Sequence, residues 1–239
     1  MILTEYKPIG MTCGELIKKY ENIDSAYVGV LDPMAHGIIT ILTGPDLSKM
    51  QEHMKKNKVY KFKFIVGPNT DTDDILGIFV LDDKSNYINL EKVINYINNF
   101  PFEYKQKYHT FSSYKPKKKT KEGKRRPLWW WTVNGYHIDD VPARNVKLYS
   151  KKIERIYRVS GNMIQGEFLN KISKIKGDKF RKGETIKQWT EYDFDEYYDV
   201  FECTITVSSG FYVRQFVKDM SDHLGVKMIV TDIERTLIF

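Results

Sequence analysis

Cysteine is scarce in this chain of 239 residues, and no long apolar run is present. Cys13 and Cys203 lie far apart without metal-ligand spacing, and the five histidines form no pair on one helical face. We therefore expect neither a disulfide framework nor a structural metal. No stretch approaches the length of a membrane span, and Pro8 and Gly10 interrupt the N-terminus before a signal sequence could form. These absences favour an intracellular protein, cytoplasmic or nuclear, that is neither secreted nor held in a membrane.

The composition nevertheless allows a substantial core. With 41% hydrophobic residues, the chain can form one domain of two close lobes over residues 1–239. Apolar alternation and helical spacing predict strands at residues 1–6, 59–66, 78–81, 146–156, 201–207 and 227–238, and helices at 12–20, 47–57, 89–100 and 213–224. The irregular segment 161–189, rich in Lys and Gly, is assigned to loops and short strands. This mixture predicts an α+β fold with a mixed, largely antiparallel central sheet and flanking helices.

The net charge of +7 is concentrated in one short segment. Residues 115–126 read KPKKKTKEGKRR, with eight basic residues and one Glu, while the rest of the chain has 30 basic and 30 acidic residues. The run Trp129-Trp130-Trp131 follows closely. Clustered cations contact phosphates and aromatic rings stack on unpaired bases, so this segment is typical of an RNA-binding finger. A solvated charged loop or a nuclear-localisation tract are alternatives, and the tryptophans are equally suited to anchoring the loop in the core.

Asp32 stands in the segment GVLDPMAHG at residues 29–37. Pro33 fixes its own φ and keeps the preceding residue out of the helical region, so Asp32 is expected on extended backbone whose direction is set locally. This makes Asp32 a candidate catalytic carboxylate. A lone Asp-Pro dipeptide more often forms a turn that caps the next element, and only the wider set of motifs outweighs that alternative.

Taken in order, the motifs of the chain resemble the TruB family of pseudouridine synthases, including eukaryotic relatives that act on the T-loop uridine of tRNA. They are Lys7-Pro8-Ile9-Gly10-Met11-Thr12, the 29–37 segment, Thr43-Gly44, Lys58-Val59-Tyr60, Gly67 with Thr70-Asp71-Thr72-Asp73, Phe111-Ser112-Ser113-Tyr114-Lys115, Val141-Pro142-Ala143-Arg144, Val207-Ser208-Ser209-Gly210-Phe211-Tyr212-Val213-Arg214 and Ile233-Glu234-Arg235. Each motif alone is common; the ordered series carries the resemblance.

The resemblance implies an RNA pseudouridine synthase that breaks the N1–C1′ bond of uridine and reattaches the base through C5, without metal or cofactor. It implies the pseudouridine synthase fold, with the basic segment forming a mobile thumb loop at about residues 111–135 that closes on RNA. The implied partner is RNA, in the first place the T-arm stem-loop of tRNA. We expect a monomer without membrane association.

Carried over to this sequence, the resemblance implies catalytic roles for Asp32, Tyr60, Tyr212 and Arg214. Asp32 would be the catalytic carboxylate, adding to the sugar, adding to the base or removing a sugar proton, and Arg214 its partner. Tyr60 would stack on the extruded base, Tyr212 would exchange a proton, and Ile233 would form an apolar wall. The alternatives are an exposed helix arginine at 214 and ordinary strand core at 60 and 233. The implied RNA-contacting residues of the thumb are Lys115, Lys117, Lys118, Lys119, Lys121, Lys124, Arg125 and Arg126.

Three features depart from the family pattern. Ala26-Tyr27 replaces the usual Gly-His pair before the aspartate segment, and Tyr27 can stack and donate one hydrogen bond in place of the histidine. The chain ends directly after the Ile233-Glu234-Arg235 motif, so we expect no C-terminal PUA domain. The thumb is also far more basic than usual. These departures leave a second hypothesis open, an RNA-binding or chaperone-like protein in which the same scaffold has lost catalysis.

Overall fold

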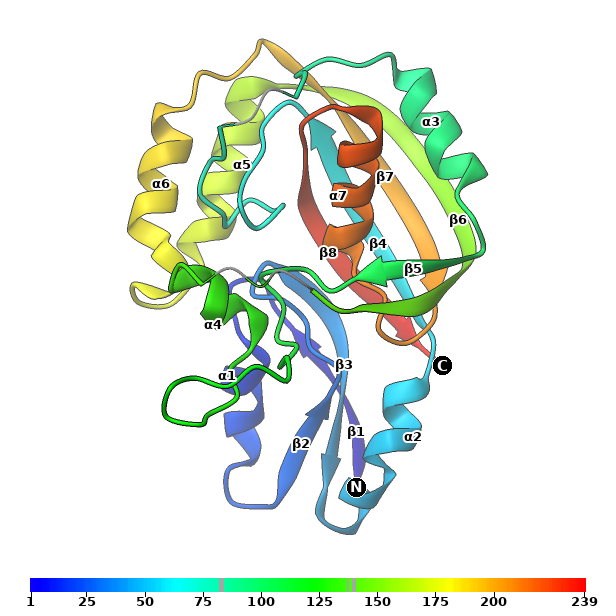
Figure 1. The fold of residues 1–239 in the computed structure, drawn as a ribbon, viewed down its shortest axis with the longest axis vertical. Helices are drawn as coiled ribbons and strands as arrows, with labels where there is room; N and C mark the ends of the chain where they lie inside the picture. Colours follow the sequence, from blue (N-terminus) through cyan, green and yellow to red (C-terminus); the bar gives the residue numbers. More distant parts are fainter. Residues whose placement is uncertain (82–83, 137, 139–140) are drawn as a thin grey trace.

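A single mixed sheet organises the computed structural model, which describes residues 1–81, 84–136, 138 and 141–239 (Figure 1). Its strands are β1 (Ile2–Lys7), β2 (Ser25–Val28), β3 (Ala35–Thr43), β4 (Lys58–Val66), β5 (Glu103–Lys107), β6 (Ala143–Ser160), β7 (Tyr197–Val207) and β8 (Met228–Ile238). Their order is β1-β3-β8-β4-β7-β6-β5, with β2 paired to β3. β3 and β8 are parallel and the other pairs are antiparallel, which confirms the predicted sheet.

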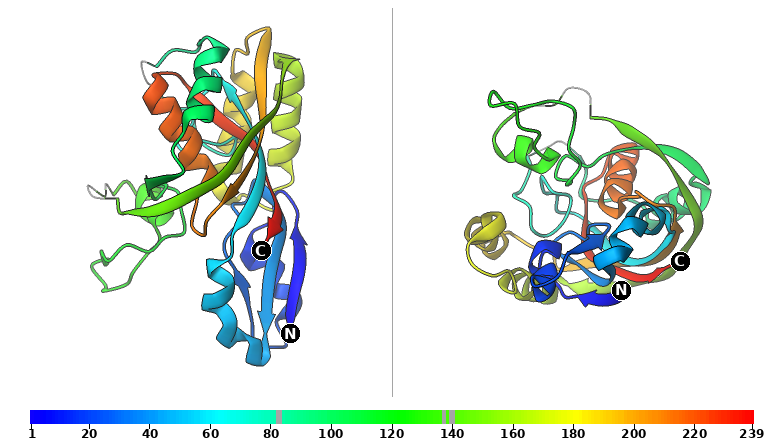
Figure 2. Two further views of the ribbon diagram at one scale, coloured as in Figure 1. Left: turned by 90° about the vertical axis from the view of Figure 1, so that its right-hand side faces the viewer. Right: turned by 90° about the horizontal axis from the view of Figure 1, so that it is seen from below.

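Helices cover both faces of this sheet. They are α1 (Cys13–Ile17), α2 (Met50–Lys55), α3 (Leu90–Asn99), α4 (Leu128–Val133), α5 (Gly161–Ser173), α6 (Lys182–Glu191) and α7 (Val213–Leu224), with 3₁₀ turns η1 (Lys18–Tyr20), η2 (Gly44–Lys49) and η3 (Lys179–Arg181). In the side view, α3 and α7 lie on one face of the sheet and α5 and α6 on the other (Figure 2). Within the described residues, no helix has the length and apolar character needed to cross a membrane.

Two apolar clusters stabilise these layers. The first joins β4 and β7 to α7, with the rings of Phe64 and Phe201 stacked at 4.8 Å and Phe216 packed in the same cluster. The second lies under α5 and α6, where Trp189 meets Phe168 edge-on at 4.8 Å. Because each face of the sheet has its own core, the loops at its edges are held from both sides.

Several predicted elements are confirmed and others are wrong. The strands at β4, β7 and β8 and the helices α3 and α7 were expected, and Thr12 and Glu15 form the predicted capping box of α1, although the helix ends at Ile17 and continues as η1. The helix expected at 47–57 is divided into η2 and α2. Segment 78–81 is no strand, because Phe79 forms only an isolated bridge with Thr70. The strands β2, β3 and β5 and the short helix α4 were not predicted.

The assignment of 161–189 to loops and short strands is also wrong, since this segment forms α5, η3 and α6. Ile164, Phe168 and Ile172 recur at helical spacing and are buried against the sheet. Gly166 and Lys171 interrupt this series in the sequence, so the Lys- and Gly-rich composition of the segment concealed a regular apolar stripe.

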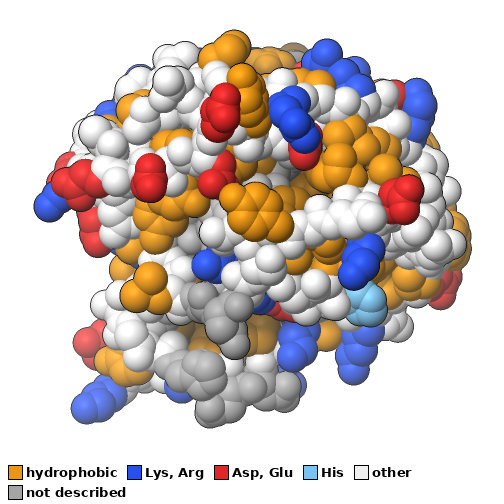
Figure 3. Space-filling view, turned by 90° about the horizontal axis from the view of Figure 1, so that it is seen from above, with side chains coloured by type: hydrophobic (Ala, Val, Ile, Leu, Met, Phe, Trp, Pro, Cys, Tyr) orange, Lys and Arg blue, Asp and Glu red, His pale blue; other side chains and the backbone are white. Residues whose placement is uncertain are grey.

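Outside the basic segment the surface charge is mixed. On the face drawn in Figure 3, basic and acidic side chains are interspersed. This agrees with the even balance of 30 basic and 30 acidic residues in the rest of the chain.

Candidate active site

A cleft of about 410 Å³ collects side chains from β2, β4, β8 and α7. The predicted residues Tyr27, Asp32, Tyr60, Tyr212, Arg214 and Ile233 all line it. Strand pairing brings them together. The parallel pairing of β3 and β8 sets Ala35 opposite Ile233, and the antiparallel pairing of β4 and β8 sets Tyr60 opposite Arg235. Asp32 lies in the turn just before Ala35 and so reaches the same cleft.

Asp32 and Arg214 form a close ion pair. Nε and Nη2 of Arg214 both lie 2.8 Å from Oδ2 of Asp32. The aspartate side chain is 28% exposed, whereas that of Arg214 is 4% exposed. The Asp-Pro turn that was the alternative reading also forms, because the backbone N–H of Ala35 donates to the Asp32 carbonyl at 3.0 Å. The turn uses the backbone of Asp32 and leaves its carboxylate for Arg214.

The guanidinium of Arg214 is fixed by further contacts. Nη1 donates to the Thr72 carbonyl at 2.8 Å, and Nη2 contacts the Phe111 carbonyl at 3.5 Å. The Asp74 carboxylate lies 3.6 Å from Nε. Burial lowers the pKa of Arg214, but Asp32 and Asp74 raise it by more, so the net shift is upward and the cation is retained. Arg214 is therefore a buried, permanently charged support for Asp32.

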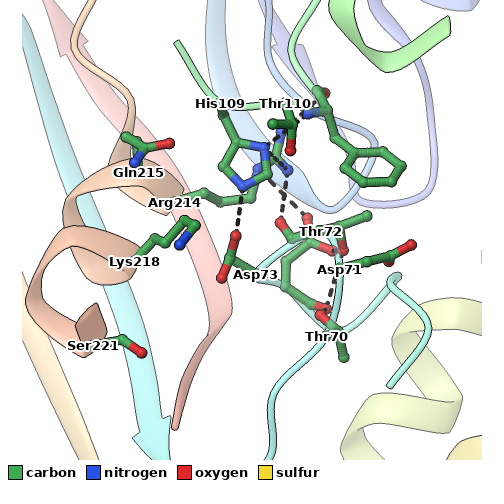
Figure 4. A network of polar contacts seen from close by, with 12 residues as sticks. Thr70, Asp71, Thr72, Asp73, His109, Thr110, Arg214, Gln215, Lys218 and Ser221 are labelled. Carbon is green, nitrogen blue, oxygen red and sulfur yellow. Dashed lines mark hydrogen bonds and ion pairs between the residues drawn. The ribbon is translucent and has the colours of Figure 1, made fainter. Parts of the chain in front are cut away.

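An acidic loop, residues 70–76 in the connection between β4 and α3, surrounds this arginine (Figure 4). Asp73 accepts a hydrogen bond from the buried His109 at 2.8 Å. Asp74 accepts from the Thr72 hydroxyl at 2.6 Å and from the backbone N–H of Leu76 at 2.9 Å. Burial raises the pKa of Asp74, partly opposed by Arg214. Among the described residues, no group of three or more His, Cys, Asp or Glu side chains is arranged to hold a metal ion.

Aromatic side chains form much of the remaining cleft wall. Tyr60 is buried, and Tyr27 is half-buried. Burial, reinforced by Asp32, raises the pKa of Tyr212 to about 12, so this phenol is protonated at neutral pH. Beside it, Tyr108 and Tyr114 stack at 3.9 Å, and Tyr108 meets Tyr212 edge-on at 5.7 Å.

The backbone of Tyr212 is clamped by one buried amide. Gln106 accepts from the Tyr212 N–H at 2.9 Å and donates to its carbonyl at 3.0 Å. Because Gln106 comes from β5, this clamp ties the residue before α7 to the edge of the sheet. The cleft can thus hold a flat ring between fixed aromatic surfaces.

Cations outnumber acids among the residues that line the cleft. The lining includes one carboxylate, that of Asp32, and four cationic side chains, those of Lys58, Arg144, Arg214 and Arg235. Burial, together with Arg235 and Arg144, lowers the pKa of Lys58 to about 8. Such an excess of positive charge suits an anionic ligand.

The basic segment lies outside the cleft. Its predicted contact residues do not line the cleft, whereas Ser113 and Tyr114, which directly precede the segment, do. These contact residues are Lys115, Lys117, Lys118, Lys119, Lys121, Lys124, Arg125 and Arg126. The loop projects from one side of the molecule (Figure 2). It folds back onto its own tryptophans, because Lys118 lies 5.3 Å from the Trp131 ring and Arg126 lies 5.5 Å from the Trp130 ring. Trp131 is buried and anchors the loop, as one of the sequence alternatives proposed.

Residues 18–161 match the sequence model described as TruB family pseudouridylate synthase (N terminal domain). The chain belongs to this family. TruB relatives named tRNA pseudouridine synthase B include that of Endomicrobium trichonymphae, 27% identical over 192 residues, which cover 76% of this chain and 79% of the relative. That of Wigglesworthia glossinidia brevipalpis is 27% identical over 248 residues, covering 100% of this chain and 59% of the relative.

Solved structures support the same pseudouridine synthase fold. A chain in a Cbf5-Nop10-Gar1 complex superposes with a TM-score of 0.53 at 15% identity, covering 99% of this chain and 48% of that one. A chain in an H/ACA RNP bound to a substrate RNA containing 2′-deoxyuridine gives a TM-score of 0.53 at 14% identity, with 99% and 47% covered. This chain thus spans about half the length of those proteins.

Several residues in or beside the cleft were given no role in the sequence analysis. Arg144 and Arg235 belonged to recognised motifs, and their place in the cleft follows from strand pairing that no local pattern reveals. Asp74 directly follows the recognised Thr70-Asp71-Thr72-Asp73 motif, which was the available signal. His109 gave no signal, because a single histidine outside any helical pattern is usually structural.

Proposed function

We propose that this chain is an RNA pseudouridine synthase and that Asp32 is its catalytic carboxylate. The observation that carries the proposal is the Asp32–Arg214 ion pair at 2.8 Å in a tyrosine-lined cleft. A carboxylate held by a buried cation stays ionised and keeps a fixed orientation. Both are needed whether the carboxylate attacks the uridine nucleotide or removes a proton from it. Both contacts from Arg214 go to Oδ2 of Asp32. Within the described residues, the other carboxylate oxygen, Oδ1, is therefore the one that can reach the substrate.

The remaining cleft residues have roles in holding an extruded base. Base extrusion costs stacking energy, which Tyr60 offsets by stacking on the pyrimidine. Ile233 closes the apolar side, and Tyr212, protonated at neutral pH, donates a hydrogen bond or a proton. In the overall reaction the N1–C1′ bond breaks, the C5–C1′ bond forms, C5 loses its hydrogen as a proton and N1 gains one.

We propose the T-loop uridine of tRNA as the target and a monomer as the active form. The names of the TruB relatives support tRNA as the substrate. The excess of cations in the cleft supports a phosphodiester-bearing ligand, and the basic segment 115–126 would add phosphate contacts along the stem.

Tritium release from tRNA labelled at uridine C5 tests the proposal, because isomerisation must expel that hydrogen. Wild-type chain should release tritium, and Asp32→Ala should lose release by about 10³-fold or more while retaining RNA affinity within about threefold. Asp24→Ala, an exposed aspartate before β2, is the matched control and should behave as wild type. Binding without release by the wild-type chain would refute catalysis and favour the RNA-binding hypothesis.

A further inference from the structure

His109 lies between the acidic loop and Arg214, two residues before the thumb loop (Figure 4). The residue is fully buried, with 0% exposure. Its Nε2 lies 2.8 Å from Oδ2 of Asp73, and its Nδ1 lies 3.4 Å from Nη1 of Arg214. His109 thus contacts the group that holds Asp32 without lining the cleft itself.

The neighbours of the imidazole fix its tautomer. The backbone N–H of Phe111 donates to Nδ1 at 3.0 Å, and Arg214 Nη1 approaches the same nitrogen as a second donor. Nδ1 is therefore an acceptor, and the ring proton resides on Nε2, which donates to Asp73. Burial and the Arg214 charge lower the pKa of His109, which keeps the ring neutral.

Within residues 70–76, the carboxylates of Asp71, Asp73 and Asp74 each have a dedicated donor. Asp71 receives Nη1 and Nη2 of Arg181 at 2.6 and 3.0 Å. Asp74 receives the Thr72 hydroxyl and the Leu76 N–H. Asp73 receives His109. Of these acids, Asp73 and Asp74 act directly on the guanidinium of Arg214, so either carboxylate would compete with Asp32 for Arg214 if it lost its donor.

We propose that His109 is a positioning residue for the isomerisation: by donating to Asp73, it keeps that carboxylate from drawing Arg214 away from Asp32. Through its second nitrogen, it also ties the first residues of the thumb to the same guanidinium, since Phe111 both donates to His109 and accepts from Arg214. The inference rests on the proposed function, because its main readout is the isomerisation rate.

Two substitutions separate positioning from packing. His109→Gln retains a donor close to the position of Nε2 and keeps Asp73 engaged, whereas His109→Asn retains an acceptor near Nδ1 and releases Asp73. His109→Asn should lower the single-turnover rate by about tenfold or more with little change in RNA affinity. His109→Gln should stay within about threefold of wild type. His223→Asn, on the exposed last turn of α7, is the control and should leave the rate unchanged.

A suppressor gives the decisive comparison. Asp73 has a φ of 54°, a conformation that asparagine tolerates well, so Asp73→Asn removes the charge without a new backbone penalty. Adding Asp73→Asn to His109→Asn should restore most of the lost rate, because no released carboxylate then competes for Arg214. If His109 were purely structural, the rate losses of His109→Asn and Asp73→Asn would instead add up in the double variant.

Crystal structures make the inference independent of activity. In the His109→Asn variant, Asp73 should move within ion-pair distance of Arg214, and the Asp32–Arg214 contact should lengthen beyond 4 Å; in His109→Gln both should stay as in wild type. Equal losses in the two variants, a slower double variant or an unmoved Asp73 would overturn the inference. A wild-type chain that releases no tritium would overturn the proposed function instead, and the structures would still decide the role of His109.

Discussion

Gly210 and Arg144 pack so closely that a β-carbon at position 210 would lie 1.8 Å from Nη1 of the arginine. The glycine also has a φ of +82°, where other residues are strained. Arg144 is one of the cleft cations, and Gly210 lies two residues before Tyr212. The missing side chain at 210 therefore makes room for a guanidinium at the cleft wall.

Gly210→Ala should push Arg144 out of this position and weaken RNA binding by about tenfold, the equivalent of about 1.4 kcal/mol. Arg144→Ala should weaken binding by a similar factor, and the double variant should be no weaker than either single variant, because both remove the same contact. Gly225→Ala is the matched control, since Gly225 has a φ of +65° but no atom within 4 Å of the added carbon. Both glycine variants should lose about 1 to 2 kcal/mol of unfolding free energy. Equal RNA affinity in Gly210→Ala and Gly225→Ala would contradict the proposed role.

The basic segment gives a prediction for salt dependence. Replacing Lys117, Lys118 and Lys119 by alanine should reduce the slope of log affinity against log salt by about 2 to 3, because each lost phosphate contact removes nearly one released counterion. A triple alanine variant of the exposed lysines Lys92, Lys176 and Lys187 controls for net charge. Filter binding to a T-arm RNA between low and moderate salt measures both slopes. Unchanged affinity and slope in the first variant would support the nuclear-localisation alternative.

His109 also predicts a pH dependence of stability. Burial and Arg214 lower its pKa from the ordinary value of 6.5, against the opposing effect of the Asp73 and Asp32 carboxylates. Below pH 6.5 the unfolded chain binds a proton that the native chain excludes, so the unfolding free energy falls as the pH falls, by at most about 1.4 kcal/mol per pH unit for one proton. Denaturant unfolding at pH 7 and pH 5.5 should show a smaller decline in His109→Gln than in wild type. Parallel declines would indicate that the native ring takes up the proton.

The ordered motifs were sufficient to predict six of the residues that meet in the cleft, namely Tyr27, Asp32, Tyr60, Tyr212, Arg214 and Ile233. Asp32 and Arg214 are distant in sequence, and no periodicity relates them; the family resemblance suggested their pairing, and the ion pair is present. Local patterns worked where one face of an element is buried, as in β4 and α7. They failed for α5, where polar residues, one glycine and one lysine separate the residues of the apolar stripe.

The contacts of His109 could not be predicted for a different reason. Its partner Asp73 lies in a turn with positive φ, and its other contacts are to the backbone of Phe111 and to Arg214 on another element. Loop residues of this kind follow no periodic sequence pattern. Their contact partners depend on how the loops pack against the two apolar clusters. The same holds for Lys58, Arg144 and Arg235, which reach the cleft from β4, β6 and β8.

Trp189 links the second core to the acidic loop, which gives a last prediction. The residue is fully buried, and its Nε1 donates to the Ile75 carbonyl at 2.8 Å, directly after Asp74. Trp189→Phe keeps most of the packing but leaves that carbonyl without its donor, so the unfolding free energy should fall by about 1 to 3 kcal/mol. Because the loosened loop carries Asp74 and the Thr72 carbonyl that hold Arg214, kcat should also fall while KM changes little.

Phe201→Leu in the first core is the control for this variant, because it removes ring contacts with Phe64 without touching the acidic loop. The two variants should lose comparable stability, and only Trp189→Phe should lose kcat at a temperature where both are folded. Equal kcat values would mean that the acidic loop keeps Arg214 in place without support from α6, and the coupling between the second core and the cleft would have to be abandoned.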